Sequence, residues 1–276
     1  MLDGQIVDVL AADHPQSVRH VFYRMTDPRL AAPVEKTENG YQRVQRRCLA
    51  LRRSGSIPYG WIADATRRGF HVSTFNGQAD FIRRMQGLYR QNLWTDDLPR
   101  VEVWCESRSI AGVLQDDCQA LAVSLFPSGG FASATLCYEA AEDINWRRPP
   151  RAVVIYVGDY DPAGVLIDRS IEMELRQHLE VELDFRRVAI NEGQIAEYDL
   201  PTKPRKGTER RRLDIAATVE AEAMPANVLR GIVRDAVEGY LPAGALDVAR
   251  EAEESEREGL QFLADAIEQA EEEGIL

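Results

Sequence analysis

The feature that most constrains the fold is a regular alternation of apolar strand-like runs and helical stretches between residues 101 and 190. The runs VEVWCE, AVSLFP, AVVIYVGD and LDFRRVAI are separated by helical patterns such as SIAGVLQDDCQAL and GVLIDRSIEMELRQHL. Strands that alternate with helices in this way predict a mainly parallel sheet covered by helices. We therefore expect an α/β fold here, with functional groups gathered at the carboxyl ends of the strands.

The segment before this alternation is helical and basic. In YQRVQRRCLALRRSG, residues 41–55, the apolar positions Tyr41, Val44, Cys48 and Leu51 recur at spacings of three and four, which predicts an amphipathic helix. The arginines that fill its outer face are Arg43, Arg46, Arg47, Arg52 and Arg53. We predict that they contact DNA phosphates, with a plain solvated helix face as the alternative.

The order of elements around this basic helix is that of a winged helix-turn-helix module. PQSVRHVFYRM precedes it as another helical candidate, and SIPYGWIAD follows it with the Pro and Gly of a turn and the β-formers of a short strand or wing. Such a module docks its second helix against DNA. Helices are also predicted over residues 77–93 and from Ala221 to the Glu-rich end of the chain.

Charge is distributed unevenly along the 276 residues. The net charge is −12, yet residues 19–90 hold 14 Lys and Arg against 5 Asp and Glu, while residues 247–276 hold 2 against 11. The chain therefore has a basic end and an acidic end. A clustered basic surface can bind a phosphate backbone whatever the net charge of the chain, so the value of −12 does not exclude DNA as a partner.

Other classes of protein are disfavoured by the sequence. No apolar run approaches the roughly 18 to 20 residues of a membrane span, and the start of the chain is too acidic for a secretory signal, so we expect a cytoplasmic protein without a membrane partner. The four cysteines show no C-x-x-C pairing and no histidine at ligand spacing. We expect reduced, mostly buried thiols rather than a zinc site or disulfides.

Three acids follow strands of the predicted sheet. Glu106 ends VEVWCE, and AVVIYVG runs into Asp159 and Asp161. Alternation along an extended chain points the two aspartates the same way, and a neighbouring parallel strand can bring Glu106 beside them. Such carboxylates repel one another unless a hard cation neutralises them, and Mg²⁺ prefers oxygen ligands completed by substrate phosphates. The alternative is that the GD-x-D turn only caps the next helix.

These acids, in this order, resemble the Toprim domain, the metal-binding fold shared by topoisomerases, primases and certain nucleases. The stretch RHVFY, residues 19–23, looks like the R-D-[IL]-[FY]-Y motif of the A subunit of topoisomerase VI and its meiotic double-strand-break relatives, and GDYDPAG is similar to that family's GDxDPxG. The segments GGFAS and LPTKPRK resemble those of small stand-alone relatives in bacteria, phages and mobile elements. The resemblance covers roughly residues 15–220.

The resemblance implies a winged-helix domain over residues 1–98 with the catalytic tyrosine, a Toprim (Rossmann-like) domain over 99–220 and a helical extension over 221–276. It makes Tyr23 the nucleophile and Arg19 its companion, with Mg²⁺ held by Glu106, Asp159 and Asp161. Attack would leave a 5′-phosphotyrosyl link in double-stranded DNA. A homodimer follows, because in that family each site combines the Tyr of one subunit with the acids of the other. The basic loop residues Lys203, Lys206 and Arg211 are expected to meet the DNA, unless they form a plain solvated loop.

The sequence departs from the family in ways that keep other functions open. His20 stands where the motif has an acid, Ser107 follows Glu106 where relatives often carry Lys, and no part of the chain resembles the ATPase subunit of topoisomerase VI. A separate ATPase or other partner protein is therefore possible. Two alternatives remain: a metal-only endonuclease or nickase in which water replaces Tyr23, and a non-catalytic DNA-binding protein of a mobile element. In both, Phe22 and Tyr23 would serve as core packing.

Overall fold

The computed structural model describes residues 1–63, 72–204, 215 and 217–273. Its internal contacts divide the chain into two compact units, Met1–Arg67 with Asp96–Tyr240, and Arg68–Thr95 with Leu241–Leu276. The predicted domain boundaries after residues 98 and 220 do not coincide with this division and stay predictions. The first unit holds all the residues expected to carry out chemistry.

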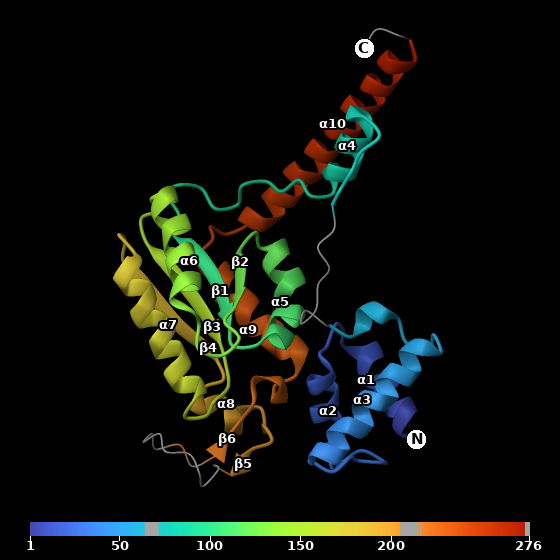
Figure 1. Cartoon of the computed structure of the whole chain (residues 1–276), viewed down its shortest axis with the longest axis vertical. Helices are drawn as coiled ribbons and strands as arrows, with labels where there is room; N and C mark the ends of the chain where they lie inside the picture. Colours follow the sequence, from blue (N-terminus) through green and yellow to red (C-terminus); the bar gives the residue numbers. More distant parts are fainter. Residues whose placement is uncertain (64–71, 205–214, 216, 274–276) are drawn as a thin grey trace. The chain divides into compact units, whose positions relative to one another are not determined.

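A four-stranded parallel sheet forms the centre of the first unit (Figure 1). Its strands are β1 (Arg100–Cys105), β2 (Ser124–Pro127), β3 (Ala152–Val157) and β4 (Leu183–Ala189), in the order β2-β1-β3-β4. All three neighbouring pairs are parallel, as the alternation of strands and helices predicts. The α/β class is thereby confirmed, and the carboxyl ends of the two central strands, β1 and β3, lie next to each other.

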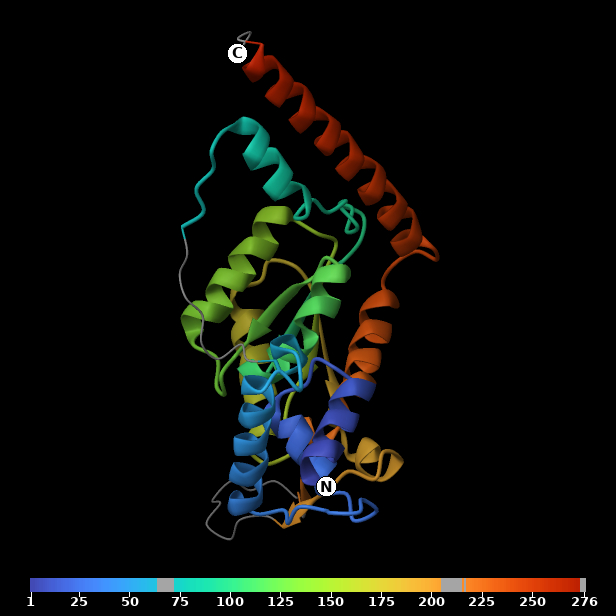
Figure 2. The same cartoon turned by 90° about the vertical axis from the view of Figure 1, so that its right-hand side faces the viewer.

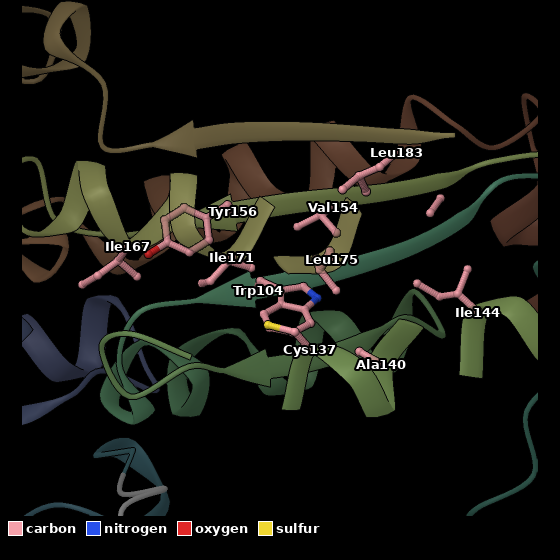
Figure 3. Close-up of a cluster of buried hydrophobic side chains, with 11 residues drawn as sticks. Trp104, Cys137, Ala140, Ile144, Val154, Tyr156, Ile167, Ile171, Leu175 and Leu183 are labelled. Atoms are coloured by element: carbon pink, nitrogen blue, oxygen red, sulfur yellow. The ribbon is translucent and has the colours of Figure 1, made fainter. Parts of the chain in front are cut away.

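One face of the sheet is covered by α6 (Ala134–Arg147) and α7 (Gly164–His178). Alternate strand residues point toward these helices because side chains change face at each step along a strand. Figure 3 shows this core, in which strand residues meet helix residues. Its largest fully buried members are Trp104, Tyr156, Ile144, Ile171 and Leu175.

The other face is covered by α5 (Arg108–Ala120), which packs on β1 and β2, and by α9 (Ala226–Glu238), which packs on β3 and β4. All six residues of β3 are buried, as expected for a central strand with helices on both faces. The segment that leads into α9 passes the carboxyl end of β3, since the N–H of Ala221 bonds Asp159.

Three helices precede the sheet: α1 (Leu2–Ala12), α2 (Val18–Met25) and α3 (Glu38–Arg53). They pack on one another, and α3 buries Val44, Cys48 and Leu51, which confirms the predicted amphipathic helix. The predicted wing corresponds to a short 3-10 turn, η1 (Tyr59–Trp61), and a single bridge between Gln16 and Ile62. Within residues 1–63 no pair of wing strands forms, so the winged-helix identity stays a prediction.

Short elements connect β4 to α9. They are α8 (Glu192–Glu197), β5 (Lys203–Pro204), β6 (Ala217–Thr218) and the 3-10 turn η2 (Ala221–Ala223). Strands β5 and β6 pair antiparallel, and Val219 just beyond them forms a bridge with Tyr160. This bridge holds residues 219–223 against the loop that carries Asp159 and Asp161.

The second unit is a pair of helices, α4 (Gln78–Gln86) and α10 (Ala245–Glu272), the latter being the long red helix of Figure 2. The two run antiparallel, since Arg83 pairs with Asp265 and Glu268 whereas the later Gln86 bonds the earlier Arg257. Acidic side chains of α10 thus neutralise arginines of its own unit. Among the described residues, no helix is both long enough and apolar enough to span a membrane.

Candidate functional site

The predicted acids lie at the carboxyl ends of the two central strands. Glu106 directly follows β1, and its Oε2 accepts a hydrogen bond from the backbone N–H of Asp159 at 3.0 Å. Asp159 and Asp161 lie in the loop between β3 and α7. The expectation that neighbouring parallel strands bring Glu106 to the D-x-D loop is therefore met.

Asp161 also caps a helix, which was the alternative interpretation of the D-x-D turn. Its Oδ1 accepts hydrogen bonds from the N–H groups of Ala163 at 2.8 Å and Gly164 at 2.6 Å, at the start of α7. These bonds satisfy donors that the first turn of a helix leaves open. The second carboxylate oxygen of Asp161 accepts no hydrogen bond from a described residue, so capping and ligand binding do not compete for the same atom.

A fourth acid, Glu222, joins this cluster although the sequence analysis did not single it out. It lies in η2, is 94% buried by relative surface, and accepts hydrogen bonds from the hydroxyls of Ser107 and Ser109 at the start of α5. One residue earlier, the N–H of Ala221 donates to Asp159 Oδ1 at 2.8 Å. The signal in the sequence is the run EAEAMP, in which acids stand among small apolar residues between a predicted loop and a helix.

Burial and like charge govern the electrostatics of this cluster. Burial raises the pKa of Glu106, and the nearby charges of Asp161 and Glu222 raise it further, against the hydrogen bond from Asp159 and the charge of Arg187. The pKa of Asp159 lies well above its ordinary value because of burial and the charges of Glu106 and Glu222. Carboxyl groups in this situation resist ionisation until a cation reduces the repulsion.

Arg187 of β4 fixes the loop that carries the aspartates. Its guanidinium donates to the carbonyl oxygens of Gly158, Asp159 and Gly164 at 2.8 to 3.2 Å, and its Nε contacts Asp168 Oδ2 at 2.5 Å. The side chain is 13% exposed. A planar guanidinium carries five N–H donors in a fixed array, so one side chain can serve several acceptors at once. Arg187 therefore positions the loop that carries the acids. It was not among the residues predicted from the sequence.

Gly164, the second glycine of GDYDPAG, begins α7 at a point where there is no room for a side chain. A Cβ on Gly164 would lie 2.2 Å from the backbone oxygen of Asp159 and 3.2 Å from Glu106 Oε2. Neither the backbone nor the carboxylate can withdraw without moving the acidic cluster. The close approach of α7 to the D-x-D loop thus depends on the absence of a side chain at this position.

Tyr23 lies inside the first unit, on α2, where Ser17 caps the helix by accepting from His20 N–H. The tyrosine is 3% exposed, and its phenol lies near enough to Glu220 for the carboxylate charge to act on it. Lys36 Nζ and Lys203 Nζ lie 5.3 and 5.8 Å from its ring centroid. Burial and the Glu220 charge raise the pKa of Tyr23, against a lowering by Arg19.

Glu220 is the link between Tyr23 and its cationic neighbours. Its Oε2 pairs with Arg19 Nη1 at 2.5 Å and its Oε1 accepts from Lys203 Nζ. Burial acts to raise the pKa of Glu220, but the hydrogen bonds and charges of Lys203 and Arg19 outweigh it and lower the pKa to about 2. Glu220 is therefore an ionised carboxylate at any physiological pH.

The amino-terminal helices are attached to the segment 220–234 by charged contacts. Arg19 pairs with Glu220, Arg24 Nη2 donates to the carbonyl of Ala223 at 2.7 Å, and Arg230 pairs with Asp13. Since the N–H of Ala221 bonds Asp159, a chain of direct contacts runs from Tyr23 through residues 220 and 221 to the acidic cluster. All of these residues belong to one chain.

The predicted DNA-contacting arginines of α3 differ in their surroundings. Arg43, Arg46 and Arg53 are exposed, whereas Arg47 pairs with Asp3 and Arg52 donates to the carbonyls of Tyr59 and Ile62. Arg52 thus braces the turn that follows α3. Of the predicted basic loop, Lys203 lies beside Tyr23, while Lys206 and Arg211 fall outside the described residues.

The acids offer oxygen donors only, which suits Mg²⁺ better than softer metals. Among the described residues, however, no group of three or more His, Cys, Asp and Glu side chains is arranged so that it could hold a metal ion. One oxygen each of Glu106, Asp159 and Asp161 accepts a hydrogen bond from a backbone N–H. The donor chemistry fits magnesium, and the second oxygens would have to turn toward it.

Comparisons of the chain with protein-family models, with curated proteins and with solved structures found no match.

Proposed function

We propose that the protein cleaves DNA through Tyr23 in a reaction that depends on Mg²⁺, in the manner of the topoisomerase VI A subunit. The observation that carries this proposal is the continuous set of contacts from Tyr23 and Arg19 through Glu220 and Ala221 to Asp159. A potential nucleophile, an arginine and a group of carboxylates with oxygen donors for a hard cation are the parts that phosphoryl transfer requires.

In the proposed reaction the phenolic oxygen of Tyr23 bonds to the phosphorus of one phosphodiester. The bond to the 3′-oxygen breaks, the phenol gives up its proton, and the 3′-oxygen gains one. Arg19 is placed to hold the phosphate oxygens, because a guanidinium donates two parallel hydrogen bonds to them. Bound Mg²⁺ would supply charge neutralisation at the phosphate, with Glu106, Asp159 and Asp161 as its ligands and Glu222 beside them.

A second candidate is favoured by the burial of Tyr23. A phenol that is 3% exposed and has a raised pKa is a poor nucleophile until the site rearranges. A metal-only endonuclease, in which water attacks the phosphate, would need only the acidic cluster. In that case Tyr23 is a packing residue. Its ring makes a tilted contact with Phe22, and Phe22 makes a T-shaped contact with Tyr41.

One experiment separates the candidates. Supercoiled plasmid is incubated with Mg²⁺ and wild type, Tyr23→Phe or Asp159→Ala, and the products are separated before and after protease treatment. Covalent protein–DNA product that both variants lose supports the proposal. Cleavage by Tyr23→Phe but not by Asp159→Ala contradicts the proposal and supports the metal-only nuclease. Binding without cleavage by any of the three proteins leaves a DNA-binding protein or one that needs a separate partner.

A further inference from the structure

Three cationic side chains gather around one carboxylate beside Tyr23. Arg19 and Lys203 both contact Glu220, and the Nζ atoms of Lys36 and Lys203 lie 5.3 and 5.8 Å from the Tyr23 ring centroid. Lys36 donates to the carbonyls of Pro201 and Thr202, and it makes no ion pair with any described residue. The surroundings of Tyr23 thus hold three positive charges, of which two, Arg19 and Lys203, are paired with the carboxylate of Glu220.

The four charged residues come from separate parts of the chain. Arg19 lies on α2, Lys36 in the loop before α3, Lys203 on β5 and Glu220 at the entrance to η2. The Arg19 and Lys203 side chains are each 42% exposed and that of Glu220 is 24% exposed. The cluster is therefore reachable from solvent while the tyrosine beneath it is buried. A solvated helix face, by contrast, draws its charges from one element.

We propose that Arg19, Lys36 and Lys203 form a phosphate-binding site beside Tyr23, and that the carboxylate of Glu220 occupies this site in the ligand-free protein. Carboxylate and phosphate oxygens accept the same charge-assisted hydrogen bonds from guanidinium and ammonium groups. A phosphate that displaced Glu220 would meet all three cations beside the Tyr23 ring. This inference rests on the proposed function in one respect, namely that the phosphate belongs to DNA.

Glu220 then acts as a positioning residue that keeps the site closed. While it holds Arg19 and Lys203, neither is available to a phosphate, and a carboxylate charge stays near the phenol of Tyr23. Replacing Glu220 by Gln keeps the size of the side chain but removes the charge that attracts the cations. The phosphate site should then be open without competition.

The test measures binding in EDTA, where cleavage does not occur. Inorganic phosphate is titrated by calorimetry and a fluorescent 30-base-pair duplex by anisotropy, with wild type, Glu220→Gln and Glu180→Gln. Glu180 is exposed before β4, so its replacement makes the same charge change far along the chain from the cluster. We expect Glu220→Gln to bind both probes about tenfold more tightly than wild type. For the duplex, the slope of log K against log salt concentration should become steeper by about one. Glu180→Gln should match wild type.

A further variant identifies the cations responsible. Adding Lys203→Gln to Glu220→Gln should remove most of the gain, because one of the released cations is then missing. If Glu220→Gln does not fold, Lys36→Gln in the wild-type background replaces it and should weaken phosphate binding several-fold. Unchanged phosphate affinity in the folded variant, or an equal gain in Glu180→Gln, overturns the proposal.

The two probes also separate this inference from the proposed function. Tighter binding of phosphate without tighter binding of the duplex supports the anion site but assigns it to a small phosphate compound. Tighter binding of both without cleavage of DNA under Mg²⁺ supports the site and contradicts the proposed reaction. Cleavage through Tyr23 with unchanged binding in Glu220→Gln overturns this inference and leaves the proposed reaction standing.

Discussion

Glu102 is a carboxyl group with no exposed surface in the middle of β1. Trp104 Nε1 donates to its Oε2 at 3.0 Å, and Arg100 Nε lies 4.0 Å from its Oε1. Burial raises the pKa of Glu102 to about 7, although the Trp104 hydrogen bond and the Arg100 charge lower it. The folded protein therefore holds this proton at pH values where the unfolded chain, with a Glu pKa of 4.5, has released it.

The sign of the resulting pH dependence follows from that difference. Between pH 4.5 and 7 the folded state binds more protons than the unfolded state, so Glu102 costs stability as the pH rises. We predict that the free energy of unfolding of Glu102→Gln, relative to wild type, increases by about 3 kcal/mol from pH 4.5 to pH 8. Urea unfolding at several pH values measures this difference.

The control for this prediction is Glu139→Gln on α6, where the side chain is exposed. Its difference from wild type should stay constant over the same range. Parallel stability curves for Glu102→Gln and wild type would mean that Glu102 stays ionised in the folded protein.

We expect the carboxylate of Asp159 to lower the folding stability of the metal-free protein. Its pKa is raised by burial and by the charges of Glu106 and Glu222, so ionising it at neutral pH costs folding free energy. We predict that Asp159→Asn, which keeps an oxygen to accept from Ala221 N–H, melts a few degrees higher than wild type at pH 7 in EDTA. Magnesium should raise the melting temperature of wild type and leave that of the variant unchanged.

Exposed Asp116 on α5 provides the matched control for this charge removal. Asp116→Asn should melt close to wild type and keep the response to magnesium. An Asp159→Asn protein that melts lower than wild type in EDTA would show that the carboxylate stabilises the loop rather than straining it.

At the scale of elements, the junction of β3 with α7 is set by close packing. We predict that Gly164→Ala destabilises the protein by about 1 to 3 kcal/mol, because its Cβ would meet the backbone oxygen of Asp159 at 2.2 Å. Gly231→Ala in the interior of α9 has open space around the new methyl group and should stabilise the protein by up to about 1 kcal/mol. Thermal unfolding of both variants measures the contrast, and equal effects would contradict the packing argument.

The elements themselves follow closely from local patterns. The strand runs and helical spacings after residue 100 predict the parallel sheet, and the placement of Glu106 beside the D-x-D loop follows from strand geometry alone. The pair Glu220 and Glu222 could not be predicted in the same way. They lie in a short irregular segment, and their partners Arg19 and Ser109 are 201 and 113 residues away.

Residues that hold a loop by hydrogen bonds to its backbone are equally hidden in the sequence. Arg187 in LDFRRVAI looks like any basic residue of a strand, and only the folded chain shows that it donates to the loop of residues 158–164. The predicted wing failed to appear as strands within residues 1–63 because Pro58 and Gly60 lead into a 3-10 turn braced by Arg52.

At the scale of the whole molecule, the proposed reaction predicts how many chains act together. A single site cuts one strand, so cleavage of both strands requires a second copy. We predict that the protein component of the DNA complex, measured by light scattering with the duplex mass subtracted, is twice the 31.1 kDa of one chain. Double-strand breaks made by a species with the mass of one chain would contradict the homodimer.

The central claim is that Tyr23 and the acidic cluster form one DNA-cleaving site, and mass spectrometry of the covalent product tests it most directly. Duplex DNA is incubated with the protein and Mg²⁺, the reaction is stopped with detergent, and nuclease and trypsin digestion follow. We predict a nucleotide attached through its 5′-phosphate to the peptide His20–Arg24, at Tyr23, and its loss in Asp159→Asn. Cleaved DNA with no modified tyrosine, or with a nucleotide on another residue, would contradict the claim.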